Sequence, residues 1–191
     1  MKVVAFNGSA RKNGNTSILI KEVFKGLEDQ EIETELIDLS GQKICGCVAC
    51  GKCVKNKNNK CALTDDLVNE YVAKMAQADG IIIGSPTYFA DCTAATKALI
   101  ERAGMVGRAN NDLFKRKVGA AVVAVRRGGA IHAFDSINHF FTISQMIIVG
   151  SSYWNIGVGH QLKDVDNDQE GLDTMRTLGK NISWLLRKIN T

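Results

Sequence analysis

A polar loop near the N-terminus carries the residue types that bind phosphate. Residues 8–17 lie between an apolar run at residues 3–6 and a helical pattern that starts at Ile18. Small residues let the backbone approach a ligand, and free N–H groups at a helix N-terminus attract anions. The loop lacks the G-x-G-x-x-G spacing of a dinucleotide site and the G-K-[ST] ending of a triphosphate loop, so it suits one terminal monophosphate. The competing interpretation is an ordinary polar turn. The candidate phosphate ligands are Ser9, Arg11, Asn15, Thr16 and Ser17.

The cysteines form a second group with chemical potential. Cys47, Cys50 and Cys53 are spaced by two residues, and Cys61 follows after a short loop. Four thiolates arranged in this way can hold a [4Fe–4S] cluster. They also satisfy tetrahedral Zn²⁺, and a third interpretation is a reduced loop without metal. Nearby lysines would partly offset the negative charge of a cluster: Lys52, Lys55, Lys57 and Lys60.

Alternating apolar patterns predict the elements that must position these residues. Strands are expected at residues 3–6, 31–39, 80–84, 118–125 and 146–149, with helices after each of them. Five such units form a doubly wound α/β sheet, in which ligands bind beyond the carboxyl ends of the strands. Residues 45–64 break this rhythm as a cysteine-rich loop inserted after the second strand. With one proline and no linker, residues 1–191 are expected to form a single domain.

Three segments carry a resemblance to a known family. The loop at residues 8–17 and the segments 79–89 and 97–102 resemble the flavodoxin-fold NAD(P)H-dependent FMN reductases and quinone reductases. The cysteine motif resembles that of the iron–sulfur flavoproteins, a branch of the same superfamily. The likeness covers most of the first 130 residues. It implies a flavodoxin-like five-stranded parallel sheet of order 2-1-3-4-5, non-covalent FMN, and a homo-oligomer for which a tetramer is the expected state.

The same resemblance assigns the flavin ring to two further loops. The turn after the third strand contributes Pro86, Thr87, Tyr88 and Phe89, and the loop after the fourth contributes Arg126, Arg127 and Gly128. An arginine at this place can stabilise negative charge on a reduced flavin. The alternatives are that the two aromatic side chains only cover the core and that the arginines are a surface pair.

Composition excludes several other classes of protein. The net charge is +4 with scattered basic residues, so a nucleic-acid surface is not expected. No apolar run is long enough to span a membrane. The chain enters a strand at once, which leaves no room for a signal peptide and predicts a cytoplasmic protein with reduced thiols.

These observations predict an FMN-dependent redox protein. With a cluster, electrons would pass from a ferredoxin-like donor through the cluster to FMN and on to an unidentified acceptor. Cluster and flavin are expected on the same rim of the sheet, or across a subunit boundary. Without a cluster, the protein would be an NAD(P)H-dependent FMN or quinone reductase. Two further alternatives are a flavodoxin-like electron carrier, which is usually acidic, and a zinc-stapled binding module.

Overall fold

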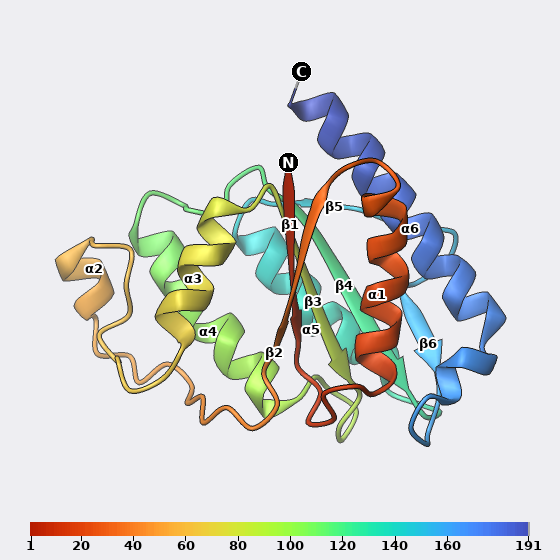
Figure 1. The fold of residues 1–191 in the computed structure, drawn as a ribbon. Helices are drawn as coiled ribbons and strands as arrows, with labels where there is room; N and C mark the ends of the chain where they lie inside the picture. The colour runs from red at the N-terminus through yellow and green to blue at the C-terminus, as the bar shows by residue number, and fades with distance from the viewer. Residues whose placement is uncertain (191) are drawn as a thin grey trace.

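The computed structural model describes residues 1–190 and shows a parallel sheet with helices on both faces (Figure 1). Its long central strands are almost entirely buried, as expected for a parallel sheet covered on both sides. The strands are β1 (Lys2–Asn7), β2 (Glu33–Asp38), β3 (Gly80–Pro86), β4 (Val118–Val125), β5 (Ile147–Ile148) and β6 (Ile156–Val158). The helices are α1 (Asn15–Glu28), α2 (Lys52–Asn56), α3 (Val68–Gln77), α4 (Ala94–Ala109), α5 (Ala130–Ile143), the 3₁₀-helix η1 (Asp164–Asn167) and α6 (Gln169–Ile189).

Two hydrophobic cores lie on opposite faces of the sheet. Val3 and Ala5 of β1 belong to the core under α1 and α6, whereas Val4 and Phe6 belong to the core under α3, α4 and α5. This division follows from the two-residue period of a strand, which sends successive side chains to opposite faces. The result is the three-layer arrangement of a doubly wound fold.

The strand order β2-β1-β3-β4-β5 confirms the predicted topology. The position beyond β4 differs in detail, because two short strands share it and the sheet has six strands. β5 pairs with the start of β4 at Val118 and Gly119, and β6 pairs with its end at residues 123–125. The predicted strand at residues 146–149 is therefore shorter than expected, and β6 was not predicted.

Asn155 bridges the gap between the two short strands. The buried side-chain amide of Asn155 donates to the Ala121 carbonyl over 2.9 Å, and the backbone carbonyl of Asn155 accepts from the Val123 N–H over 2.9 Å. Between β5 and β6, β4 has no neighbouring strand to pair with the Ala121 carbonyl, and the Asn155 side chain supplies that hydrogen bond instead. The buried backbone group is therefore paired although the edge of the sheet is interrupted.

The cysteine-rich segment follows β2 and lies along the outer side of α3 and α4 (Figure 1). It contains the five-residue helix α2, which the sequence did not predict and which has no buried residue. Gly51 precedes α2 with φ +67°, a left-handed conformation that glycine adopts at little cost. The segment is thus an ordered addition to the sheet.

Candidate functional site

A pocket of about 270 Å³ opens at the carboxyl ends of β1, β3 and β4. This is where parallel α/β sheets bind their ligands. Most of the residues that line this pocket were predicted from the sequence to contact the phosphate or the ring of the flavin. The residues that line it are Ser9, Arg11, Asn15, Thr16, Pro86, Thr87, Tyr88, Ala124, Arg126, Gly159 and His160.

Three polar atoms in this pocket lack a hydrogen-bond partner in the part of the chain that the structure describes. They are the Asn15 Oδ1, Thr16 Oγ1 and Thr87 Oγ1 atoms, all buried. Buried polar groups are almost always paired, so such a concentration at one pocket indicates a missing polar ligand. A phosphate and a ribityl chain carry the hydroxyl donors and oxygen acceptors that would satisfy these atoms.

The N-terminus of α1 faces the same pocket with free donors. Its N-cap residue, Gly14, provides no side-chain cap, and the first backbone bond of the helix runs from Ile18 N–H to the Gly14 carbonyl. The amide groups of residues 15–17 therefore precede the helical ladder. With the positive end of the helix dipole, they form a site for an anion.

Buried side chains hold the N-terminal loop in shape. The Asn7 side chain is fully buried, donates to Asp38 Oδ1 over 2.6 Å and accepts from the Ser9 N–H over 3.1 Å. The Ser9 hydroxyl in turn accepts from the Arg11 N–H over 3.0 Å. The loop is thus pre-organised before any ligand binds.

The segment after β6 forms a pocket wall that sequence reasoning missed. Arg11 Nη1 donates to the His160 carbonyl over 3.3 Å, and Asn15 Nδ2 donates to the Gln161 carbonyl over 2.9 Å. A Cβ atom at Gly159 would lie 2.8 Å from Asn15 Nδ2, so glycine is required for this approach. In the sequence, the two glycines at positions 157 and 159 are the feature that could have indicated a close approach of this segment to the pocket.

The turn after β3 presents one of its two aromatic side chains to the pocket. Tyr88 and Asp91 exchange backbone hydrogen bonds of 2.8 and 3.1 Å across a two-residue turn, in which Phe89 and Ala90 have φ of +49° and +63°. Tyr88 lines the pocket. Phe89 is fully exposed at the tip of the turn and does not line it, which corrects its predicted position.

The other predicted flavin residues lie outside the pocket lining. Ser17 is buried on α1, while Arg127 and Gly128 are exposed beyond Arg126. The reason is geometric, since neighbouring residues in a loop or helix cannot all point into one cavity.

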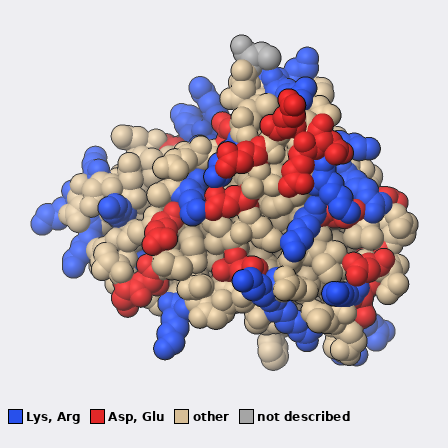
Figure 2. All heavy atoms as spheres, viewed as in Figure 1, with Lys and Arg blue, Asp and Glu red and all other residues tan. Residues whose placement is uncertain are grey.

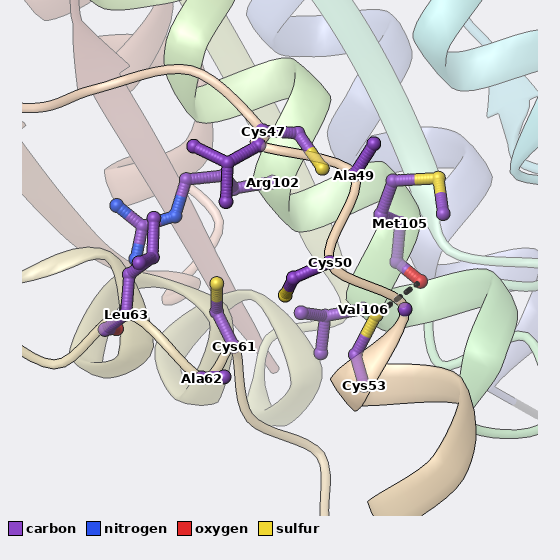
Figure 3. A pocket seen from close by; sticks show the side chains of 12 residues that line it. Cys47, Ala49, Cys50, Cys53, Cys61, Ala62, Leu63, Arg102, Met105 and Val106 are labelled. Carbon is purple, nitrogen blue, oxygen red and sulfur yellow. Dashed lines mark hydrogen bonds between the residues drawn. The ribbon is translucent and has the colours of Figure 1, made fainter.

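The cysteines line a second pocket, of about 120 Å³, between the cysteine-rich segment and α4 (Figure 3). The side chains of Cys47, Cys50, Cys53 and Cys61 all border it, together with Arg102 and Met105 of α4. Cys45 and Cys92 lie elsewhere. Burial raises the pKa of the Cys92 thiol to about 11, so this thiol is neutral and unsuited as a ligand.

Hydrogen bonds from α3 and α4 position these cysteines. The Cys47 N–H donates to Glu101 Oε2 over 3.2 Å, and the Cys61 N–H donates to Asn69 Oδ1 over 2.7 Å. Asn69 also donates to the Cys61 and Leu63 carbonyls, each over 3.1 Å. The first and last cysteines are therefore anchored on two different helices.

Four cysteines border one pocket, and four thiolates are the donor set of an iron–sulfur cluster as well as of a zinc ion. Within residues 1–190, no three cysteine, histidine or acidic side chains converge closely enough to hold a single metal ion. A lone zinc ion needs its thiolates about 2.3 Å from one point, whereas an iron–sulfur cluster takes one thiolate at each of its irons.

The two pockets share no lining residue. α4 begins next to the turn after β3, but its residues in the cysteine pocket lie eight or more positions further along the helix, about 12 Å or more at 1.5 Å per residue. The expectation that both groups lie on the same rim of one chain is therefore wrong. The cysteine pocket flanks the helical layer instead.

Comparisons with known proteins agree with this geometry. Residues 1–161 match the family model described as NADPH-dependent FMN reductase. The chain is also 39% identical to an iron–sulfur flavoprotein of Methanocaldococcus jannaschii, over 99% of both chains. The chain belongs to the iron–sulfur flavoprotein branch of the FMN reductase family.

A further relative and a solved structure agree with this family assignment. An iron–sulfur flavoprotein of Methanosarcina thermophila is 32% identical, over 99% of this chain and 97% of the relative. Among solved structures, a flavodoxin-like, WrbA-like protein from Agrobacterium tumefaciens superposes with a TM-score of 0.66 at 17% identity, covering 98% of this chain and 97% of the other. That likeness shows the flavodoxin-like fold. No helix within the described part of the chain is both long and apolar enough to cross a membrane.

Proposed function

We propose that this protein is an FMN-dependent electron-transfer enzyme in which Cys47, Cys50, Cys53 and Cys61 hold a [4Fe–4S] cluster. The observation that carries the proposal is that one chain builds two separate pockets. One is bordered by four cysteines, and the other by a helix N-terminus with unpartnered polar atoms. The names of the relatives support this pair of groups.

The FMN phosphate would bind the loop at residues 8–17. Ser9, Arg11 and Thr16 line that part of the pocket, and the free amides at the start of α1 add donors. Tyr88 and Arg126 border the opposite part, where they would contact the ring. Bound FMN supplies hydride and single-electron chemistry, while the chain supplies orientation and electrostatics. Phe89, Arg127 and Gly128 lie outside the pocket lining, at its outer edge.

A ferredoxin-like donor is the proposed source of electrons. Lys52, Lys55, Lys57 and Lys60 are all exposed on and around α2, next to the cysteine pocket. Figure 2 shows basic side chains gathered over this part of the molecule. An acidic donor would be steered to this surface by charge.

A second candidate is favoured by the family model itself. NADPH-dependent FMN reductases take hydride from a nicotinamide nucleotide, and the match covers residues 1–161. In that case NAD(P)H would be the donor and the cysteine pocket would serve another role.

Assembly would complete the electron path. Because the two pockets share no residue within one chain, we propose a cytoplasmic homotetramer in which neighbouring chains bring them together. The exposed aromatic side chains Phe89, Tyr153 and Trp154 are candidates for the contacts.

Anaerobic purification followed by flavin, iron and acid-labile sulfide analysis tests the proposal. We expect one FMN, four irons and four sulfides per chain, the stoichiometry of one flavin and one [4Fe–4S] cluster. Replacing any of the four pocket cysteines by alanine should remove iron and keep FMN, and Cys45→Ala is the matched control that keeps both. One zinc without sulfide, or FMN alone with rapid NAD(P)H oxidation, would contradict the cluster and favour the alternatives.

A further inference from the structure

We propose that Arg102 raises the reduction potential of the iron–sulfur group by donating a hydrogen bond from its Nε atom to a sulfur at the Cys61 side of the pocket. This inference rests on the proposed function. Arg102 comes from α4 and borders the cysteine pocket, and its side chain is fully buried. In the proposed function, Arg102 is neither a ligand of the cluster nor a contact of the flavin.

Two of its three guanidinium nitrogens are already engaged. Nη1 forms an ion pair with Asp66, whose side chain is also buried, and Nη2 donates to the Leu63 carbonyl over 3.0 Å. These contacts fix the plane of the guanidinium, because its five donors form a rigid fork. The third nitrogen, Nε, is buried and has no hydrogen-bond partner among residues 1–190.

A purely structural role explains only part of this geometry. The Asp66 pair and the Leu63 contact tie the end of the cysteine-rich segment to α4. They do not require an additional N–H to be buried without an acceptor, which is costly. The structure leaves that donor on the side of the pocket where Cys61 lies (Figure 3).

Cys61 and Arg102 line the same pocket, and the Cys61 sulfur lies on the side of the pocket where the guanidinium lies (Figure 3). A neutral thiol is a weak acceptor, whereas a thiolate or a cluster sulfide is a strong one. The unused Nε–H would be satisfied when the pocket is loaded.

The buried positive charge of Arg102 would change the reduction potential of the bound group. Reduction adds one electron and no atom, so the group becomes more negative by one charge. A buried cation with a hydrogen bond to sulfur favours that state, since hydrogen bonds to the sulfurs and local charge set cluster potentials. Arg102 would thus make the group easier to reduce.

The test uses two variants that both lack the buried carboxylate. Asp66→Asn keeps Arg102, and the double variant Asp66→Asn with Arg102→Gln removes its charge and its Nε donor without leaving Asp66 unpaired. Midpoint potentials are measured by redox titration with electron paramagnetic resonance, alongside iron and sulfide content. Arg102→Lys serves as the variant that keeps the charge and loses the fork.

We expect the double variant to keep its iron and to have a lower midpoint potential than the Asp66→Asn variant. The expected change is at least tenfold in the ratio of reduced to oxidised cluster at a fixed potential, which is about 59 mV for one electron. Arg102→Lys should lie between wild type and the double variant.

Two results would overturn the tuning role alone. One is an unchanged potential in the loaded double variant, and the other is loss of iron with FMN retained, which would make Arg102 a tether of the segment. Absence of iron and sulfide from the wild-type protein would instead overturn the proposed cluster and this inference together.

Discussion

The side-chain amide of Asn15, in the first turn of α1, donates to the carbonyl of Gln161 over a distance of 2.9 Å. This bond joins the start of α1 to the loop after β6, 146 positions further along the chain. It leaves Asn15 Oδ1 buried at the pocket, without a hydrogen-bond partner among the residues that the structure describes. One side chain therefore closes the wall of the candidate flavin site and keeps an acceptor free for the ligand.

Replacing Thr16 by valine should weaken FMN binding without destabilising the flavin-free protein. The Thr16 hydroxyl has no partner within the described residues, so its removal breaks no internal hydrogen bond. We expect a loss of about 0.5–1.5 kcal/mol in FMN binding, the usual contribution of one neutral hydrogen bond. Fluorescence titration of the apoprotein with FMN measures it.

A matched control exists for this variant. The Ser144 hydroxyl is also buried and without a partner in residues 1–190, but it lies at the end of α5, away from the pocket. Ser144→Ala should leave the FMN dissociation constant unchanged. Equal effects of the two substitutions would remove Thr16 from the site.

Replacing Arg11 by alanine should weaken FMN binding more than Thr16→Val does. Arg11 lines the pocket and is held by the His160 carbonyl, so it would reach the phosphate as a charged donor. We expect a loss of about 1.5–3 kcal/mol, typical of a charge-assisted hydrogen bond. Lys12→Ala removes a neighbouring exposed charge outside the pocket lining and is the control for simple charge loss.

Cys92 should resist alkylation in the folded, metal-free protein. Its thiol is buried and its pKa is raised to about 11 by burial, so at pH 8 only about one molecule in a thousand carries the reactive thiolate. The exposed Cys45 and Cys50 should react first. Mass spectrometry after iodoacetamide treatment, with and without denaturant, measures the order of modification. Early labelling of Cys92 in the folded state would contradict the prediction.

Replacing Glu22 by glutamine should destabilise the protein at neutral pH. The buried Glu22 carboxylate bonds to Lys25 and to Arg176 of α6. Burial raises its pKa, but the two cations outweigh burial, so the pKa lies below its usual value of 4.5. A carboxylate with a lowered folded-state pKa stabilises the fold above about pH 4.5, and that contribution is lost as the pH falls through the folded-state pKa.

The expected loss for Glu22→Gln at pH 7 is about 1–3 kcal/mol of unfolding free energy, because a charged partner is left without its bond. Urea unfolding at pH 7 and in acid measures it, and the difference from wild type should shrink in acid. Glu31→Gln, at an exposed turn position, is the control and should have little effect. A difference that stays constant with pH would show that the pair does not act through its charge.

Local patterns were sufficient for the parts of the fold that lie within one element or one turn. The apolar runs of β1, β3 and β4, the polar loop before α1 and the spacing of Cys47, Cys50 and Cys53 are each contained in a few consecutive residues. Burial on both faces makes a parallel strand continuously apolar, so such a strand can be recognised from sequence. The family motifs then supplied the order of the strands, which the structure confirms.

Tertiary structure alone decided which distant residues complete the two pockets. β6 has only three residues, too few for a periodic pattern, so the wall at Gly159 and His160 could not be anticipated. Arg102 looks like any charged residue of an amphipathic helix until α4 packs under the cysteine-rich segment and buries it. The sequence by itself determined which residue types were available for chemistry. Their contacts depended on packing between elements far apart in the chain, which side-chain periodicity does not encode.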